Sequence, residues 1–189
     1  MLVLKLIYFI IFTFVMLGDS VVSAYNEIHL AKLREKGSCV KCDLIGANLR
    51  EAKLGNADLS GANLRGAVLI LADLNGANLS GANLTEVNLS TANLSGLISI
   101  AANYRGANLS GANLRKANLQ KSNFLNAVMI NTDLSGANLE NVNLFGTNLS
   151  GSKLEDVDLS FARFCNTKIP SKGWKSYFVS FETNNSNCK

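Results

Sequence analysis

The sequence has a single histidine, a single tryptophan and no strong excess of charge of either sign. Catalysis needs polar groups that converge on a cleft, and no Ser/His/Asp arrangement can be built around the lone His29. No phosphate-binding loop and no zinc-type spacing of Cys and His is present either. The 18 basic and 14 acidic residues give a formal charge of +4, too small to indicate a nucleic-acid partner. We therefore expect no enzyme, no cofactor and no metal site.

The N-terminus has the organisation of a secretory signal peptide over residues 1–24. An early Lys5 precedes an apolar run, Leu6 to Leu17, and a small-residue stretch ends at Ala24, after which cleavage is expected. The apolar run is short for a bilayer span, so no membrane span is expected after cleavage, although an uncleaved anchor stays open. The mature chain is then an exported protein of the periplasm, the extracellular space or the thylakoid lumen.

Export makes the four cysteines informative, because an even number in an oxidising compartment suggests two disulfides. Three connectivities are possible. Pairing Cys39 with Cys42 and Cys165 with Cys188 is favoured, since each bond would tie down one end of the central block. The alternative is that Cys39 and Cys42 form a redox-active C-x-x-C pair, but no βαβ pattern surrounds them.

Between residues 42 and 166 the chain repeats every five residues without insertion or deletion, which makes 25 units. We number each unit from its centre, position i, which is Leu in 20 units. Position i−2 is Ala in 16 units, position i−1 is Asn in 14 and Asp in five, and 11 of the 15 glycines stand at i+2. Neither a straight helix nor a straight strand places every fifth residue on one face. A chain that bends after each unit does, with i−2 and i pointing inward and Gly at the bend.

The repeated A(N/D)LXX pattern resembles that of the pentapeptide-repeat proteins, over about two thirds of the chain. The resemblance implies an all-β fold, a right-handed quadrilateral β-solenoid with four pentapeptides per coil, so that residues 20 apart stack. Six coils at a spacing of ~4.8 Å would make a rod roughly 30 Å long.

The segments that flank the block are expected to close its two open ends. Residues 25–41 predict a helical N-terminal cap and a linker, with Asn26 as the N-cap of the helix and Gly37 after its end. Residues 167–189 predict a C-terminal capping tail, in which the aromatic residues are Trp174, Tyr177, Phe178 and Phe181.

The repeat is least regular in the stretch LSGLISIAANYRG, residues 94 to 106. Leu97 takes the usual place of Ala, and Ser99 takes the usual place of Leu, so the inward volume is nearly conserved. Tyr104 can fill the next Leu position if its hydroxyl group finds a partner. We interpret the break as a packing variation and not as a functional site.

Outward apolar residues gather at one place when residues 20 apart are stacked. Leu125 stacks on Phe145, and Val128 with Ile130 begins the neighbouring wall; we name these four residues the apolar patch. An exposed patch of this kind can bind a protein partner. The C-terminal tail could equally cover it.

These features lead to a non-enzymatic, exported structural or protein-interaction scaffold with an unidentified protein partner and a possible homodimer contact through an end cap. The alternative is an exported thiol-disulfide protein that uses Cys39 and Cys42. Some members of the family mimic DNA and bind a topoisomerase, but that role needs a strongly acidic rod. A net basic, exported chain does not fit it.

Overall fold

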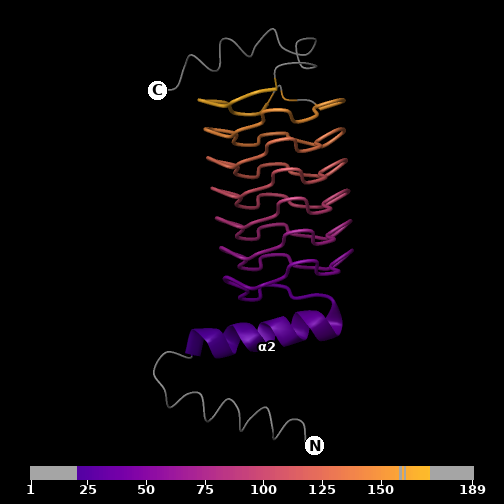
Figure 1. Cartoon of the computed structure of the whole chain (residues 1–189), viewed down its shortest axis with the longest axis vertical. Helices are drawn as coiled ribbons and strands as arrows, with labels where there is room; N and C mark the ends of the chain where they lie inside the picture. The colour runs from indigo at the N-terminus through magenta and orange to yellow at the C-terminus, as the bar shows by residue number, and fades with distance from the viewer. Residues whose placement is uncertain (1–20, 158, 160, 171–189) are drawn as a thin grey trace, which may run out of the picture.

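The computed structural model describes residues 21–157, 159 and 161–170. It consists of one helix, α2 (Val21–Lys36), and a stack of coils that rises from it along a single axis (Figure 1). The described coils contain no continuous strand. They are joined by isolated parallel bridges, each between the i−1 positions of two successive coils. Most of the expected signal peptide and most of the C-terminal tail lie outside the described residues.

Residues 20 apart stack on one another, as the sequence predicts. Asn63 bridges Asn83, which in turn bridges Asn103, and the same step repeats on all four walls. The Leu64 N–H donates to the Asn83 carbonyl at 2.7 Å, and the Asn83 N–H donates to the Ala62 carbonyl at 2.9 Å. These hydrogen bonds run along the axis from coil to coil and pair the backbone groups of a chain that bends too often to form longer strands.

Every corner uses a residue with positive φ at position i+2 wherever the structure gives its φ. Gly66 has a φ of 64°, and the Ala67 N–H donates to the Leu64 carbonyl across the corner at 3.0 Å. A positive φ at the third residue of such a turn explains why glycine is frequent there. The geometry also holds where glycine is missing, as at Leu71 with a φ of 60°.

The core is a column of inward Leu and Ala side chains that are almost completely buried along the whole stack. Full burial of each Leu side chain contributes about 1.5–3 kcal/mol, so the repeated centre residue is the main stabilising element. Where position i−2 carries a hydroxyl group, that group donates to the carbonyl of the centre residue 23 positions earlier. The donor and acceptor pairs are Ser122 and Ser99, Thr132 and Leu109, Thr147 and Phe124, Ser152 and Met129, and Thr167 and Leu144.

The irregular stretch is a repacked piece of this core, which confirms the interpretation from the sequence. Ser99 and Tyr104 are both 0% exposed, and their side-chain oxygens lie 2.7 Å apart. The Tyr104 ring stacks on Phe124 with 4.6 Å between ring centroids. Burial raises the pKa of the Tyr104 phenol, although the hydrogen bond to Ser99 opposes this shift. The small residue at position 99 therefore makes room for the ring and satisfies its hydroxyl group.

The outward Asn residues have two structural roles, which explains why this residue type repeats. The Asn83 side-chain oxygen accepts the Thr85 N–H at 3.2 Å, a local bond typical of Asn in turns. The amide nitrogen of Asn83 donates to the side-chain oxygen of Asn63, one coil earlier, at 3.1 Å. Stacked Asn side chains on this wall are therefore joined from coil to coil by amide hydrogen bonds.

Helix α2 lies across the N-terminal end of the stack (Figure 1). The helix begins at Val21, so the expectation that Asn26 is its N-cap is wrong. Leu30 and Leu33 are its buried side chains, and the Gly37 N–H donates to the Leu33 carbonyl at 2.9 Å with a φ of 65° at Gly37. No helix among the described residues is long and apolar enough to cross a membrane.

The coil geometry begins one unit earlier than the repeat in the sequence. Cys39 occupies a centre position, with its N–H donating to the Asp58 carbonyl at 2.7 Å, and Lys41 has the corner φ of 53°. Because this unit has Cys in place of Leu and Gly37 in place of Ala, its sequence does not show the pattern.

Candidate functional site

The four residues of the apolar patch point outward on two neighbouring walls, as expected from the 20-residue stacking. Leu125 and Phe145 hold the same position in successive coils, and the Asn126 N–H donates to the Phe145 carbonyl at 2.8 Å. Val128 and Ile130 follow around the corner, where Val128 bridges Asn148. All four patch side chains are half-buried. The patch therefore wraps one edge of the rod near its C-terminal end.

Arg163 borders this patch, and reasoning from the sequence did not identify it. Its guanidinium carbon lies 5.2 Å from the centroid of the Phe145 ring, a cation–π contact. The two residues are 18 positions apart, which joins position i+1 of one coil to position i−1 of the next. Arg115 and Asp133 are also 18 positions apart and in contact. A search of the sequence for pairs 18 residues apart would therefore have predicted both contacts.

A charged network lies on another wall and is centred on Asp133. Its carboxylate lies 3.3 Å from Arg115 and 3.6 Å from Lys153, and the Ser135 hydroxyl lies 2.6 Å from one of its oxygens. Partial burial raises the pKa of Asp133, but the bonds from Ser135 and Arg115 outweigh it and hold that pKa below its usual range. Asp133 and Lys153, which bridge one another in successive coils, thus form an ion pair.

Lys53 and Asp73 bridge one another in successive coils, but they are not among the ion pairs of the described residues. Asp73 accepts hydrogen bonds from the Asn93 amide at 2.9 Å and from the Asn75 N–H at 3.1 Å instead. A hydrogen bond from the uncharged Asn93 amide thus joins the i−1 side chains of these two coils in place of an ion pair.

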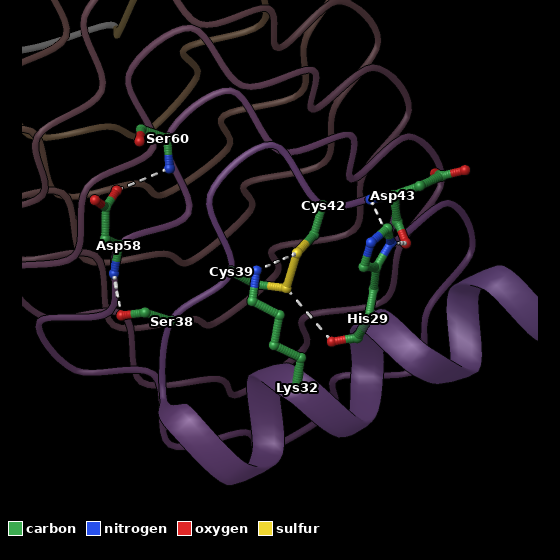
Figure 2. The surroundings of a disulfide bond; sticks show 8 residues. All are labelled: His29, Lys32, Ser38, Cys39, Cys42, Asp43, Asp58 and Ser60. Atoms are coloured by element: carbon green, nitrogen blue, oxygen red, sulfur yellow. Dashed lines mark hydrogen bonds between the residues drawn. A yellow bond between two sulfur atoms is a disulfide. The ribbon is translucent and has the colours of Figure 1, made fainter. Parts of the chain in front are cut away.

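The disulfide between Cys39 and Cys42 is present and lies beside helix α2 (Figure 2). Cys39 is 0% and Cys42 is 1% exposed. Thiol–disulfide exchange requires a thiolate to reach one of the sulfur atoms, which this burial prevents. Cys165 is also disulfide-bonded, whereas its expected partner, Cys188, lies outside the described residues.

His29 joins helix α2 to the first coil (Figure 2). Its Nδ1 accepts the Asp43 N–H at 3.0 Å, and its carbonyl oxygen lies 3.4 Å from the Cys39 sulfur. Lys32 approaches the same bond, with 3.9 Å between its Nζ and the Cys42 sulfur. These contacts attach the helix to the end of the stack.

Within the described ranges, no group of three or more His, Cys, Asp or Glu side chains is placed to hold a metal ion. A groove at the C-terminal end contains Glu140, Asp156 and Phe161. Its lining contains two carboxylates but no Ser, Thr, Cys, Lys or His side chain. The apolar patch is therefore the feature with the clearest capacity for an interaction.

Comparison with known proteins identifies the repeat. The family model for pentapeptide repeats matches eight copies, over residues 42–81, 63–96, 107–144 and 133–169. The matched segments leave out residues 97–106, which contain the Ser99–Tyr104 pair. No curated protein sequence matches the chain.

Several solved structures of pentapeptide-repeat proteins are similar to the chain. Rfr23 from the cyanobacterium Cyanothece 51142 is 32% identical over 76% of this chain and 98% of its own, with a TM-score of 0.35. HetL from Nostoc sp. strain PCC 7120, involved in heterocyst differentiation regulation, is 29% identical over 72% and 78%, with a TM-score of 0.37. A protein from the Arabidopsis thaliana thylakoid lumen is 26% identical over 66% and 72%, with a TM-score of 0.29. The chain belongs to the pentapeptide-repeat family.

Proposed function

We propose that the chain is an exported, non-enzymatic scaffold that binds a protein partner through the apolar patch. The observation that carries this proposal is the position of Leu125, Phe145, Val128 and Ile130, which meet at the edge between two neighbouring walls. Apolar side chains gathered on the surface of a soluble protein typically mark an interaction site. The neighbouring Arg163 adds a residue type that is enriched in protein interfaces.

The regular walls of the rod support a binding role over a catalytic one. The inward positions are filled by core side chains, and the outward Asn residues are engaged in local and ladder hydrogen bonds. A continuous solenoid presents an extended surface on which partners can dock, and function in such folds depends on the surface residues. The formal charge of +4 argues against mimicry of DNA.

Export belongs to the same proposal and rests on the signal-like sequence of residues 1–24. The right-handed sense of the coil and the capping role of the C-terminal tail also belong to it. Cleavage after Ala24 would remove the first turn of α2 and would leave its buried residues, Leu30 and Leu33, in place.

The test is crosslinking capture from the native exported fraction, with three forms of the full chain as bait. One is the wild type, and one is the double variant Leu125→Glu, Phe145→Glu. The third is Ile98→Glu, a control that places the same charge at an outward residue, 44% exposed, on a different wall. Circular dichroism first verifies that all three are folded.

We expect a partner that the wild type and the Ile98→Glu control capture and the double variant loses. If all three baits capture the same proteins, or if none captures any, the apolar patch is not a binding surface and the proposal is wrong.

A further inference from the structure

We propose that the C-terminal segment, residues 171–187, is the resting occupant of the apolar patch, held there by the disulfide of Cys165. A partner would then have to displace this segment to bind. The displacement step rests on the function proposed above, whereas the docking of the segment can be tested without it.

The first observation is where the described chain ends. Lys168 bridges Asn148, one coil above Val128, so Pro170 follows at the position that Ile130 and Ser150 hold in the coils below. Pro170 is buried although this position points outward elsewhere on the wall. The segment therefore starts at the top of the column of side chains that contains Ile130.

The second observation is where the segment is tied at its other end. Cys165 is one coil above Phe145, and the Gly146 N–H donates to the Cys165 carbonyl at 2.7 Å. Cys165 is disulfide-bonded, and two of the four cysteines already pair with each other, which leaves Cys188 as its intrachain partner. The segment thus begins above Val128 and Ile130, and its other end is attached above Leu125 and Phe145.

The direction of the Cys165 side chain favours the wall over the open end of the rod. Position i+1 points away from the core, as Leu125 and Phe145 do in the two coils below. A bond from this position holds Cys188 on the outer surface, beside the Phe145 ring, and not above the inward core residues.

Length and composition allow the segment to cover the patch. The 17 residues from 171 to 187 reach roughly 56 Å when extended. The patch lies one or two coils below the two attachment points, or about 5–10 Å. The segment carries four aromatic residues, Trp174, Tyr177, Phe178 and Phe181, which are suited to cover apolar side chains. Two attachment points also give it a high local concentration, on the order of millimolar, at the patch.

The docking is tested by site-specific photo-crosslinking in the oxidised full chain, followed by peptide mapping. A benzoylphenylalanine replaces Leu125 in the patch, Ile98 on a different wall as the control, or Phe161 at the C-terminal end of the stack. Phe161 is 65% exposed, so the probe is tolerated there and reports a segment that covers the end instead.

We expect the probe at position 125 to crosslink to the peptide that contains residues 171–187. The yield should fall about tenfold when Cys188→Ser removes the tether. The probe at Ile98 should give no such product. The inference is overturned if position 125 does not reach the segment, if Ile98 gives an equal yield, or if only position 161 crosslinks.

A second readout separates this inference from the proposed function. If both hold, Cys188→Ser raises the capture of the partner several-fold, and Leu125→Glu with Phe145→Glu abolishes it. A crosslink at position 125 without any captured partner supports the docked segment and contradicts the binding role. Patch-dependent capture without the crosslink supports the binding role and contradicts the docked segment.

Discussion

The paired change at Ser99 and Tyr104 can be tested with a double-mutant cycle. The two side-chain oxygens are 2.7 Å apart, and both residues are fully buried. Tyr104→Phe leaves the Ser99 hydroxyl without its partner, and Ser99→Ala leaves the Tyr104 hydroxyl without one. Because a buried polar group that loses its partner costs about 1–3 kcal/mol, each single variant should be destabilised by that amount.

The double variant removes both hydroxyl groups and leaves no unpaired polar atom at this position. Its cost should therefore be smaller than the sum of the two single costs by about 1 kcal/mol. The Ser122 hydroxyl donates to the Ser99 backbone carbonyl, a bond that Ser99→Ala preserves, so the cycle isolates the side-chain pair.

Urea unfolding, followed by far-UV circular dichroism, measures the four free energies of unfolding. Hydrogen exchange at the amides of residues 97–106 verifies that the loss is local, because repeat arrays can open coil by coil. Additive costs in the double variant would refute the view that residue 99 is small because it serves Tyr104.

Three further predictions concern a charge, a corner and a disulfide. The pKa of Asp133 is held below its usual range, so its contribution to stability is present above about pH 4 and is lost as the pH falls through the lowered pKa. Asp133→Asn should therefore reduce the fall in Tm between pH 5 and pH 3. An unchanged fall in Tm would contradict this prediction. Leu71 is 50% exposed and has a φ of 60°, so Leu71→Asn should raise stability by about 0.5–1 kcal/mol, whereas the control Leu71→Ala, which keeps the unfavourable φ, should not. The double variant Cys39→Ala, Cys42→Ala, which lacks this disulfide, should lose about 2 kcal/mol in its free energy of unfolding. Hydrogen exchange at the amides of α2 should become faster, while exchange at residues 97–106 should not change. Equal acceleration at both places would refute a local role of the disulfide.

The repeat predicted the coil because every unit of five residues has the same pattern of inward, outward and corner positions. Two inward positions, one outward Asn and one corner residue recur with a period of five, and only a bend after each unit buries the inward set. The 20-residue register alone then predicts that Leu125 and Phe145 stack on one another. Long, strongly periodic segments leave little freedom for another fold.

Three features were not predicted from the sequence, because they do not follow the five-residue pattern or the 20-residue columns. The unit centred on Cys39 is recognisable from its backbone, through the Cys39 N–H bond to the Asp58 carbonyl and the φ of Lys41, because its residues do not match the repeat. The start of α2 at Val21 was not predicted, because residues 21–24 belong to the signal-like sequence. The contact of Arg163 with Phe145 follows a diagonal offset, which a search along single columns does not examine.

Whether the apolar patch binds a partner is measured by the affinity of a captured partner for the full chain and its variants. Isothermal titration calorimetry would compare the wild type, the Ile98→Glu control and the variant Leu125→Glu, Phe145→Glu. We predict that the control keeps its Kd within about twofold and that the patch variant loses at least tenfold in affinity, which corresponds to about 1.4 kcal/mol. An unchanged Kd in the patch variant would contradict the account.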